Sequence, residues 1–158
     1  LKSNNTPSAI ALSRQKVPYI NPKNSKENKS EKGAYVVNIT SHESNVTLLA
    51  SGTEVELALK VQTKLKENNI HSKVVSMPCM ELFDKQSEKY KKDLLEDNSL
   101  VVTLEAGSIT SWQKYTENKD LNLGIDQFGE SAPYKEVYDH FNLTENKITS
   151  FIQKKLRE

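Results

Sequence analysis

The sequence predicts an α/β domain of three layers, with a mostly parallel sheet and one antiparallel strand. One observation is the apolar run Val46–Ala50, which ends at Gly52 and is followed by a helical pattern and a β-branched run ending at Ser76. This order is typical of the strand–helix–strand unit of a parallel sheet. Leu100–Leu104 is a continuous apolar run, as expected for a central strand buried on both faces. Strand and helix patterns also alternate along the chain.

The composition is that of a globular domain with an ordinary mixed-charge surface. The chain has 158 residues and carries 22 lysines and arginines against 21 aspartates and glutamates. A net charge of +1 gives no basic footprint for nucleic acid, and the apolar runs are too short to span a membrane. The single cysteine, Cys79, excludes an internal disulfide and fits a reducing compartment. We therefore expect a cytoplasmic location, with neither nucleic acid nor membrane as a partner.

The first part of the chain is expected to lie outside the main domain. Residues 9–12 could form one short buried strand, but the run at 23–32 has no apolar side chain and is typical of a solvated linker. A lone strand before a linker suggests the end of a preceding domain. We therefore divide the chain into residues 1–20 as the last strand and exit of that domain, 21–33 as a linker, and 34–158 as the main α/β domain. The absence of a starting methionine agrees with a piece of something longer.

In the main domain, Tyr35–Ile39 is predicted to be a strand that pairs antiparallel with Val46–Ala50, because the polar residues 40–45 are too few for a crossover helix. The helix that follows Gly52 is predicted to begin with a capping box formed by Thr53 and Glu56. A polar helical segment with Tyr90, Leu94 and Leu95 facing inward is then expected before Leu100–Leu104.

The last third of the chain is predicted to hold three more helices and one strand. Ser108 is expected to cap a short helix that buries Ile109, Trp112 and Tyr115, and residues 125–128 are expected to form a last short strand. Ser131 and Pro133 are typical of the start of the next helix, and Thr144 of the final one. The apolar stripes of these two helices are Tyr134, Val137, Tyr138 and Phe141, and Ile148, Phe151, Ile152 and Leu156.

Three strand ends should meet at the carboxyl edge of the sheet, where open α/β folds bind ligands. They are Gly52, Pro78 and the trio at 105–107. Glu105 is the ionisable group there, and it either binds a ligand or caps a helix or pairs across an interface. With neither a second carboxylate nor a base in view, the interface interpretation is favoured. A nucleotide site at Gly52 is disfavoured because the turn has one glycine, with Glu54 close behind it.

The remaining reactive residue types show no catalytic or metal-binding spacing. Cys79 has acidic neighbours and no adjacent histidine, which favours an inert, buried thiol. His42, His71 and His140 are scattered along the sequence without ligand spacing. Arg14 stands at the end of the predicted strand at 9–12, where its guanidinium could bind a phosphate or carboxylate through two parallel hydrogen bonds. From composition alone it would be an ordinary surface arginine.

Seven short motifs, taken in order, resemble the last quarter of transketolase and span nearly the whole chain. They are Ala-Leu-Ser-Arg-Gln at 11–15, Ala-Ser-Gly-Thr-Glu-Val at 50–55, Val-Val-Ser-Met-Pro at 74–78, Phe-Asp-Lys-Gln at 83–86, Glu-Ala-Gly at 105–107, Trp-Gln-Lys-Tyr at 112–115 and Phe-Gly-Glu-Ser-Ala-Pro at 128–133.

The resemblance implies a homodimeric enzyme of the pentose phosphate pathway that moves two-carbon ketol units between phosphorylated ketose and aldose sugars. Such enzymes use thiamine diphosphate with a Mg or Ca ion, held between N-terminal and middle domains that are almost entirely absent here. Residues 1–20 would end the middle, pyrimidine-binding domain, and 34–158 would be the C-terminal domain. Arg14 occupies the arginine position of the family's Ser-Arg-Gln motif, which binds the substrate phosphate. The linker at 23–32 departs from the family pattern.

No residue of this chain matches the family's catalytic, cofactor-binding or metal-binding positions. We therefore expect the chain alone to be inactive, to bind neither cofactor nor metal, and to contribute to domain or dimer packing. The alternative is a free-standing α/β interaction or regulatory module without catalysis.

Overall fold

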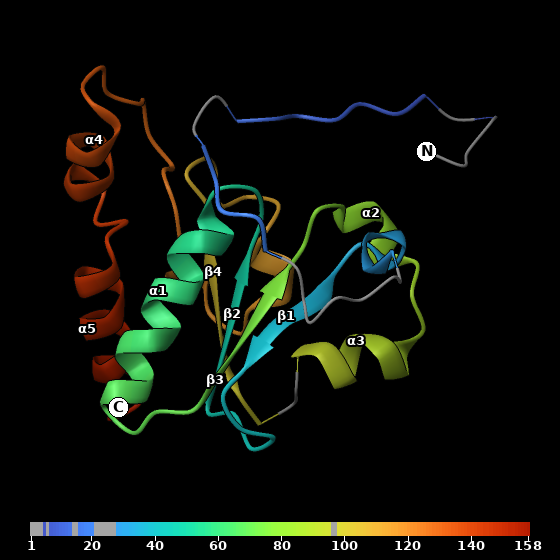
Figure 1. The fold of residues 1–158 in the computed structure, drawn as a ribbon, viewed down its shortest axis with the longest axis horizontal. Coiled ribbons are helices and arrows are strands. Elements are labelled where there is room, and N and C mark those ends of the chain that lie inside the picture. Colours follow the sequence, from blue (N-terminus) through green and yellow to red (C-terminus); the bar gives the residue numbers. More distant parts are fainter. Residues whose placement is uncertain (1–4, 6, 14–15, 21–27, 96–97) are drawn as a thin grey trace.

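The computed structural model describes residues 5, 7–13, 16–20, 28–95 and 98–158 (Figure 1). The strands are β1 (Tyr35–Ile39), β2 (Val46–Ala50), β3 (Ser72–Ser76), β4 (Leu100–Leu104) and β5 (Asn122–Leu123). The helices are α1 (Glu54–Glu67), α2 (Met80–Asp84), α3 (Glu88–Leu95), α4 (Tyr134–His140) and α5 (Glu145–Lys155), with single-turn 3-10 helices η1 (Lys29–Lys32), η2 (Gln113–Tyr115) and η3 (Lys119–Leu121).

The five strands form one sheet in the order β1-β3-β2-β4-β5. β2 is parallel to both β3 and β4, β5 is parallel to β4, and β1 is antiparallel to β3. Helices α1 and α5 cover one face of the sheet and α2 and α3 the other (Figure 1). The predicted fold class, three layers with a mostly parallel sheet and one antiparallel strand, is confirmed.

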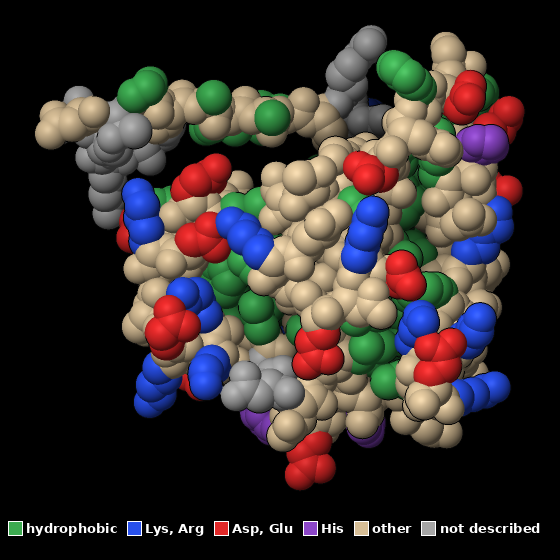
Figure 2. All heavy atoms as spheres, turned by 180° about the vertical axis from the view of Figure 1, so that it is seen from behind, with side chains coloured by type: hydrophobic (Ala, Val, Ile, Leu, Met, Phe, Trp, Pro, Cys, Tyr) green, Lys and Arg blue, Asp and Glu red, His purple; other side chains and the backbone are tan. Residues whose placement is uncertain are grey.

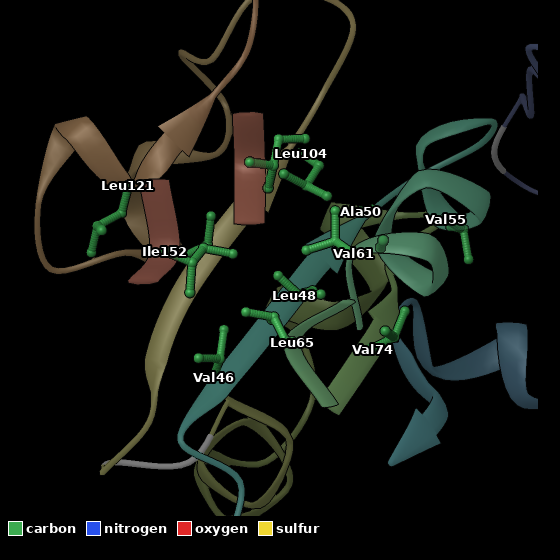
Figure 3. Close-up of a cluster of buried hydrophobic side chains, with 13 residues drawn as sticks. Val46, Leu48, Ala50, Val55, Val61, Leu65, Val74, Leu104, Leu121 and Ile152 are labelled. Carbon is green, nitrogen blue, oxygen red and sulfur yellow. The ribbon is translucent and has the colours of Figure 1, made fainter. Parts of the chain in front are cut away.

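The central strand β2 contributes to the hydrophobic cores on both sides of the sheet. Leu48 packs with Val61 and Leu65 of α1 and with Ile152 of α5 in one core cluster (Figure 3). Its neighbour Leu49 packs in the opposite cluster, whose other members are Ala34, Val75, Met77, Phe83, Leu94 and Trp112. Successive side chains of a strand point to opposite faces, so a continuous apolar run is what a strand between two helical layers needs.

The expected partner of β1 is wrong: β1 pairs with β3 and not with β2. The connection at 40–45 crosses the end of β3, where the Thr40 amide donates to the Ser72 carbonyl (3.0 Å) and the Asn45 amide to the His71 carbonyl (2.9 Å). All five residues of β2 are buried, whereas β1 is partly exposed. The more polar strand therefore takes the edge, and the apolar strand keeps a parallel neighbour on each side.

Both edges of the sheet are irregular. The β1–β3 register shifts between Val36 and Asn38, and the Asn38 side chain donates to Gln62 of α1 (2.7 Å). At the other edge β5 has two residues, 122–123, so the strand expected at 125–128 is wrong. Thr103 donates to the Asn122 side chain there (2.9 Å), which ties the short strand to β4.

The expected helix starts are only partly right. Thr53 does not form the capping box with Glu56, because its hydroxyl donates to Glu54 Oε1 (2.6 Å) and makes no cap bond. Thr144 is the residue before α5 but its side chain also makes no cap bond. Ser108 is followed by a turn and then by η2, although Ile109 and Trp112 are buried as expected.

The N-terminal segment forms no strand within residues 7–13, where the buried strand at 9–12 was expected. Leu12 is 85% exposed and Ile10 66% exposed, and Figure 2 shows this segment standing off the body of the domain with apolar side chains on its surface. No described strand lies beside it to supply hydrogen bonds or an apolar face. The division into residues 1–20, 21–33 and 34–158 stays a prediction.

Gly33 has a structural role at the point where the chain enters the sheet. Its φ of +82° lies in the left-handed region, and a Cβ there would overlap the backbone of Cys79 and Phe83 at α2. The Cys79 amide donates to the Gly33 carbonyl (3.1 Å). Only glycine combines this backbone conformation with such a close approach.

We predict that Gly33→Ala lowers the free energy of unfolding by about 2–4 kcal/mol, because positive φ and overpacking each contribute strain. Gly129→Ala is the matched control, since a Cβ at Gly129 meets nothing within 4 Å. The control should lie within about 1 kcal/mol of the natural protein. Urea denaturation measures both variants, and equal stabilities would contradict the prediction.

Candidate functional site

The carboxyl ends of β2, β3 and β4 meet at one edge of the sheet, as predicted. The Met77 amide, just after β3, donates to the Ala50 carbonyl at the end of β2 (2.8 Å). Ser51, which follows β2, donates from its hydroxyl to Glu105 Oε2 at the end of β4 (3.3 Å). Residues around Gly52, Pro78 and Glu105 therefore lie together.

Glu105 is a half-buried carboxylate held by neutral donors. Besides Ser51, the indole Nε1 of Trp112 donates to Glu105 Oε2 (3.1 Å). Burial raises the pKa of Glu105 above its usual value, and the nearby negative charge of Glu54 raises it further, against the lowering effect of the two hydrogen bonds. No lysine or arginine of the described residues forms an ion pair with it.

Glu54 is the second carboxylate that the sequence interpretation missed. It is the first residue of α1 and is 5% exposed. Its Oε1 accepts hydrogen bonds from the Thr53 hydroxyl (2.6 Å) and from the Tyr138 hydroxyl of α4 (2.5 Å). Burial, followed by the hydrogen bond to Glu54, raises the pKa of Tyr138 to about 12. A carboxylate at the start of a helix is also stabilised by the helix dipole.

The two carboxylates form a junction between four elements. The four donors come from the end of β2, the residue before α1, the turn after β4 and helix α4, and each is an uncharged hydroxyl or indole. No group of three or more His, Cys, Asp or Glu in the described part of the chain could hold a metal ion. The arrangement connects elements and offers no nucleophile–base pair.

A cavity of about 870 Å³ lies beside this junction, between the N-terminal segment, α1, α4 and the start of α5. Thr53 and Tyr138, which bond Glu54, also line the cavity, but Glu54 and Glu105 do not. Lys60 on its wall is paired with Glu56 (2.7 Å). The full set of lining residues is Lys16, Val17, Thr53, Glu56, Leu57, Lys60, Tyr134, Lys135, Tyr138, Leu143, Thr144, Glu145 and Asn146.

The other candidates from the sequence are not brought together. The burial expected for Cys79 is wrong: this residue is partly exposed, and its thiol donates to Glu81 Oε2 (3.4 Å). The His140 ring packs edge-on against Phe141. Arg14 lies outside the described residues, so its predicted phosphate contact stays a prediction. No helix in the described part of the chain is long and apolar enough to cross a membrane.

Two of the sequence motifs meet in a structural contact that sequence spacing could not reveal. Asp84 at the end of α2 accepts hydrogen bonds from the Lys114 ammonium (2.5 Å) and from the Tyr115 hydroxyl (2.8 Å). Burial, and then the bond to Asp84, raises the pKa of Tyr115 to about 12. The pair of motifs at 83–86 and 112–115 thus holds α2 against η2.

We predict that Glu105→Gln becomes more stabilising as pH rises. The folded state holds the Glu105 proton more tightly than the unfolded chain does, so its contribution to stability is present at low pH and is lost as pH rises through the raised pKa. Glutamine keeps an acceptor for Ser51 and Trp112 without the charge. Urea denaturation at pH 4 and pH 7 should show a larger gain at pH 7.

Glu43→Gln is the control, because Glu43 is exposed before β2 at the opposite end of the parallel strands. It should show no such trend. A Glu105→Gln protein that loses stability relative to the natural chain as pH rises would contradict the prediction.

Residues 33–144 match the family described as Transketolase-like TK C-terminal domain. A transketolase from Rhodobacter capsulatus is 38% identical over 97% of this chain and 24% of its own length. A transketolase from Aquifex aeolicus is 38% identical over 98% of this chain and 23% of its own length.

Solved structures agree. A transketolase from Pichia stipitis superposes with a TM-score of 0.80 at 30% identity, over 89% of this chain and 20% of that chain. One from Campylobacter jejuni gives 0.71 at 37% identity, over 78% of this chain and 19% of that chain.

The chain thus spans about a quarter of the length of the curated relatives it matches. The family match covers most of the α/β domain, including the three strand ends and the carboxylate junction. On these grounds the chain belongs to the transketolase family, in its C-terminal-domain part.

Proposed function

We propose that the complete protein is a transketolase, which transfers two-carbon ketol units between phosphorylated ketose and aldose sugars with thiamine diphosphate. The observation that supports this most is the extent of the match, since 97% of the chain aligns with a transketolase at 38% identity. A shared fold alone would not support an activity, but similarity at this level over the whole chain does. The homodimer and the place in the pentose phosphate pathway belong to the same proposal.

The chemistry of the reaction lies outside this chain in our proposal. The described residues offer no carboxylate cluster for Mg or Ca, and the one turn that resembles a phosphate-binding loop has Gly52 followed by Glu54 and Glu56 at the helix start. These residues do not fit thiamine diphosphate or its metal ion. The chain's own contribution is then structural: it packs against the rest of the protein.

The cellular location is also part of the proposal. The cytoplasmic location expected from the sequence stays a proposal, because relatives from Solanum tuberosum and Spinacia oleracea are named chloroplastic transketolases.

The activity is tested on the complete protein with a ketose phosphate donor and an aldose phosphate acceptor. Ketol transfer that requires thiamine diphosphate and a divalent metal ion is the expected result. The same assay and a calorimetric titration with thiamine diphosphate should show neither transfer nor binding for the 158-residue chain. Micromolar cofactor binding by that chain would contradict the proposal that thiamine diphosphate is held by parts of the protein outside this chain.

Arg14 is the one residue of this chain that we propose touches substrate, through the sugar phosphate. Its guanidinium can donate two parallel hydrogen bonds to a phosphate, which the ammonium of lysine cannot reproduce. We predict that Arg14→Ala in the complete protein raises KM for phosphorylated sugars by about ten- to a hundredfold, corresponding to a charge-assisted bond of about 1.5–3 kcal/mol. The reacting carbonyl is at the other end of the sugar, so kcat should change less.

An unphosphorylated ketol donor supplies the discriminating measurement, because it has no phosphate to lose. Its kinetics should be nearly unchanged by Arg14→Ala, and Arg157→Ala near the chain's end serves as a charge-matched control. Equal losses for both donors would mean that Arg14 supports the fold and does not contact the phosphate.

A further inference from the structure

The cavity beside the carboxylate junction has walls that combine apolar and charged side chains. At about 870 Å³ it lies within the range of pockets that hold small organic molecules. Its apolar and aromatic side chains are Val17, Leu57, Tyr134, Tyr138 and Leu143, and its charged side chains are Lys16, Glu56, Lys60, Lys135 and Glu145. Walls of this composition suit a ligand that has an apolar part and a charged group.

Two tyrosine rings of α4 form an aromatic wall of the cavity. Tyr134 and Tyr138 are one helical turn apart and pack edge to face, with ring centroids 6.2 Å apart and ring planes at 85°. Burial, followed by the hydrogen bond to Glu54, raises the pKa of Tyr138 to about 12, so this ring carries no negative charge at neutral pH. Tyr134 is 55% exposed, and its ring can still contact a ligand. Aromatic rings pack favourably against one another in this way, so a ligand with an aromatic ring fits this wall.

The aliphatic part of the cavity belongs to well-packed regions of the domain. Leu143 is 1% exposed, and its amide donates to the Tyr138 carbonyl (2.8 Å). Leu57 of α1 is half-buried against the core cluster that contains Leu48. Because these side chains are already fixed, a ligand that covers them loses little free energy to ordering the protein.

The charges on the walls indicate the charge of the ligand. The lining carries Lys16, Lys60 and Lys135 against Glu56 and Glu145, which leaves one net positive charge. Lys60 is paired with Glu56 (2.7 Å), whereas Lys16 and Lys135 form no ion pair with any of the described residues. A single carboxylate balances this charge, and a multiply charged phosphate does not.

We propose that this cavity binds a small aromatic monocarboxylate, whose ring packs against Tyr134 and Tyr138 and whose carboxylate meets Lys135. Lys16 adds positive charge from the N-terminal segment, which passes the start of α1 (Figure 1) and lines the same cavity. The proposal goes beyond the proposed function and does not depend on it, because every residue that it uses belongs to this chain.

The first test titrates the 158-residue chain with indoleacetate and follows the backbone amides by NMR. Amides of residues 134–138 and 143–146 should shift saturably, with a Kd of about 1 mM or tighter for a ligand of this size. Indoleacetamide keeps the ring without the charge and should bind about tenfold more weakly, since it loses a charge-assisted hydrogen bond. Acetate keeps the charge without the ring and should give no saturable shift.

Substitutions separate the roles of the walls. Lys135→Gln should weaken binding of indoleacetate by about tenfold and leave binding of indoleacetamide unchanged. Lys89→Gln is the matched control, because Lys89 is exposed on α3, which covers the opposite face of the sheet. Asn146→Trp introduces a large side chain at an exposed position of the cavity wall. It should abolish binding of both indole probes, while unchanged amide shifts elsewhere show that the fold is kept.

The second test uses the complete protein. With indoleacetate at ten times its Kd, amide exchange through local opening across residues 134–146 should slow by about tenfold. The Asn146→Trp protein should show no such slowing.

Any of four results would overturn the proposal. Absence of saturable shifts in the chain would show that the cavity binds no such ligand. Equal affinities for indoleacetate and indoleacetamide would show that no lysine meets the carboxylate. Shifts that Asn146→Trp leaves unchanged would place the probe outside the cavity. Binding by the chain without slowed exchange in the complete protein would show that another part of that protein fills the cavity. Ketol transfer enters none of these measurements, so failure of the proposed function is distinguishable from each result.

Discussion

The parallel pairing of β2 with a neighbour on each side is the constraint on which the rest of the structure depends. β2 aligns residue for residue with β3 and β4 over its whole length, and all five of its side chains are buried. Because the three strands run the same way, their carboxyl ends share one edge of the sheet. That edge brings Ser51 to Glu105 and places α1, with Glu54 at its start, beside both.

The carboxylate junction shows how a site-like cluster can serve architecture. A half-buried glutamate whose pKa is raised by burial and by a neighbouring carboxylate, at the edge where α/β folds bind ligands, matches the usual description of a catalytic centre. Here every close donor is an uncharged side chain that belongs to a structural element. The energetic cost of partial burial is offset by hydrogen bonds that connect α1, α4 and the sheet.

The sequence predicted well what depends on local periodicity and poorly what depends on pairing. The strands Val46–Ala50 and Leu100–Leu104 and the long helix between them stand where the apolar pattern placed them. The partner of β1 was mispredicted because the length of the connection at residues 40–45 cannot show that it crosses the end of β3. Glu54 was not expected near Glu105, because its approach to that residue depends on the parallel register of β2 and β4. Short elements were also mispredicted, because two residues are too few to show a periodic pattern. β5 consists of Asn122 and Leu123 alone, and both pair with β4.

The irregular edges of the sheet have a consequence for how this domain can associate. A long, regular edge strand presents unpaired amides and carbonyls on which another chain can grow a continuous sheet. One edge here is interrupted by the register shift at Val36–Asn38, and the other ends after the two residues of β5. Neither edge offers a template of useful length, so an additional strand gains little hydrogen bonding. Copies of this domain are therefore expected to gain little from associating through the edges of their sheets.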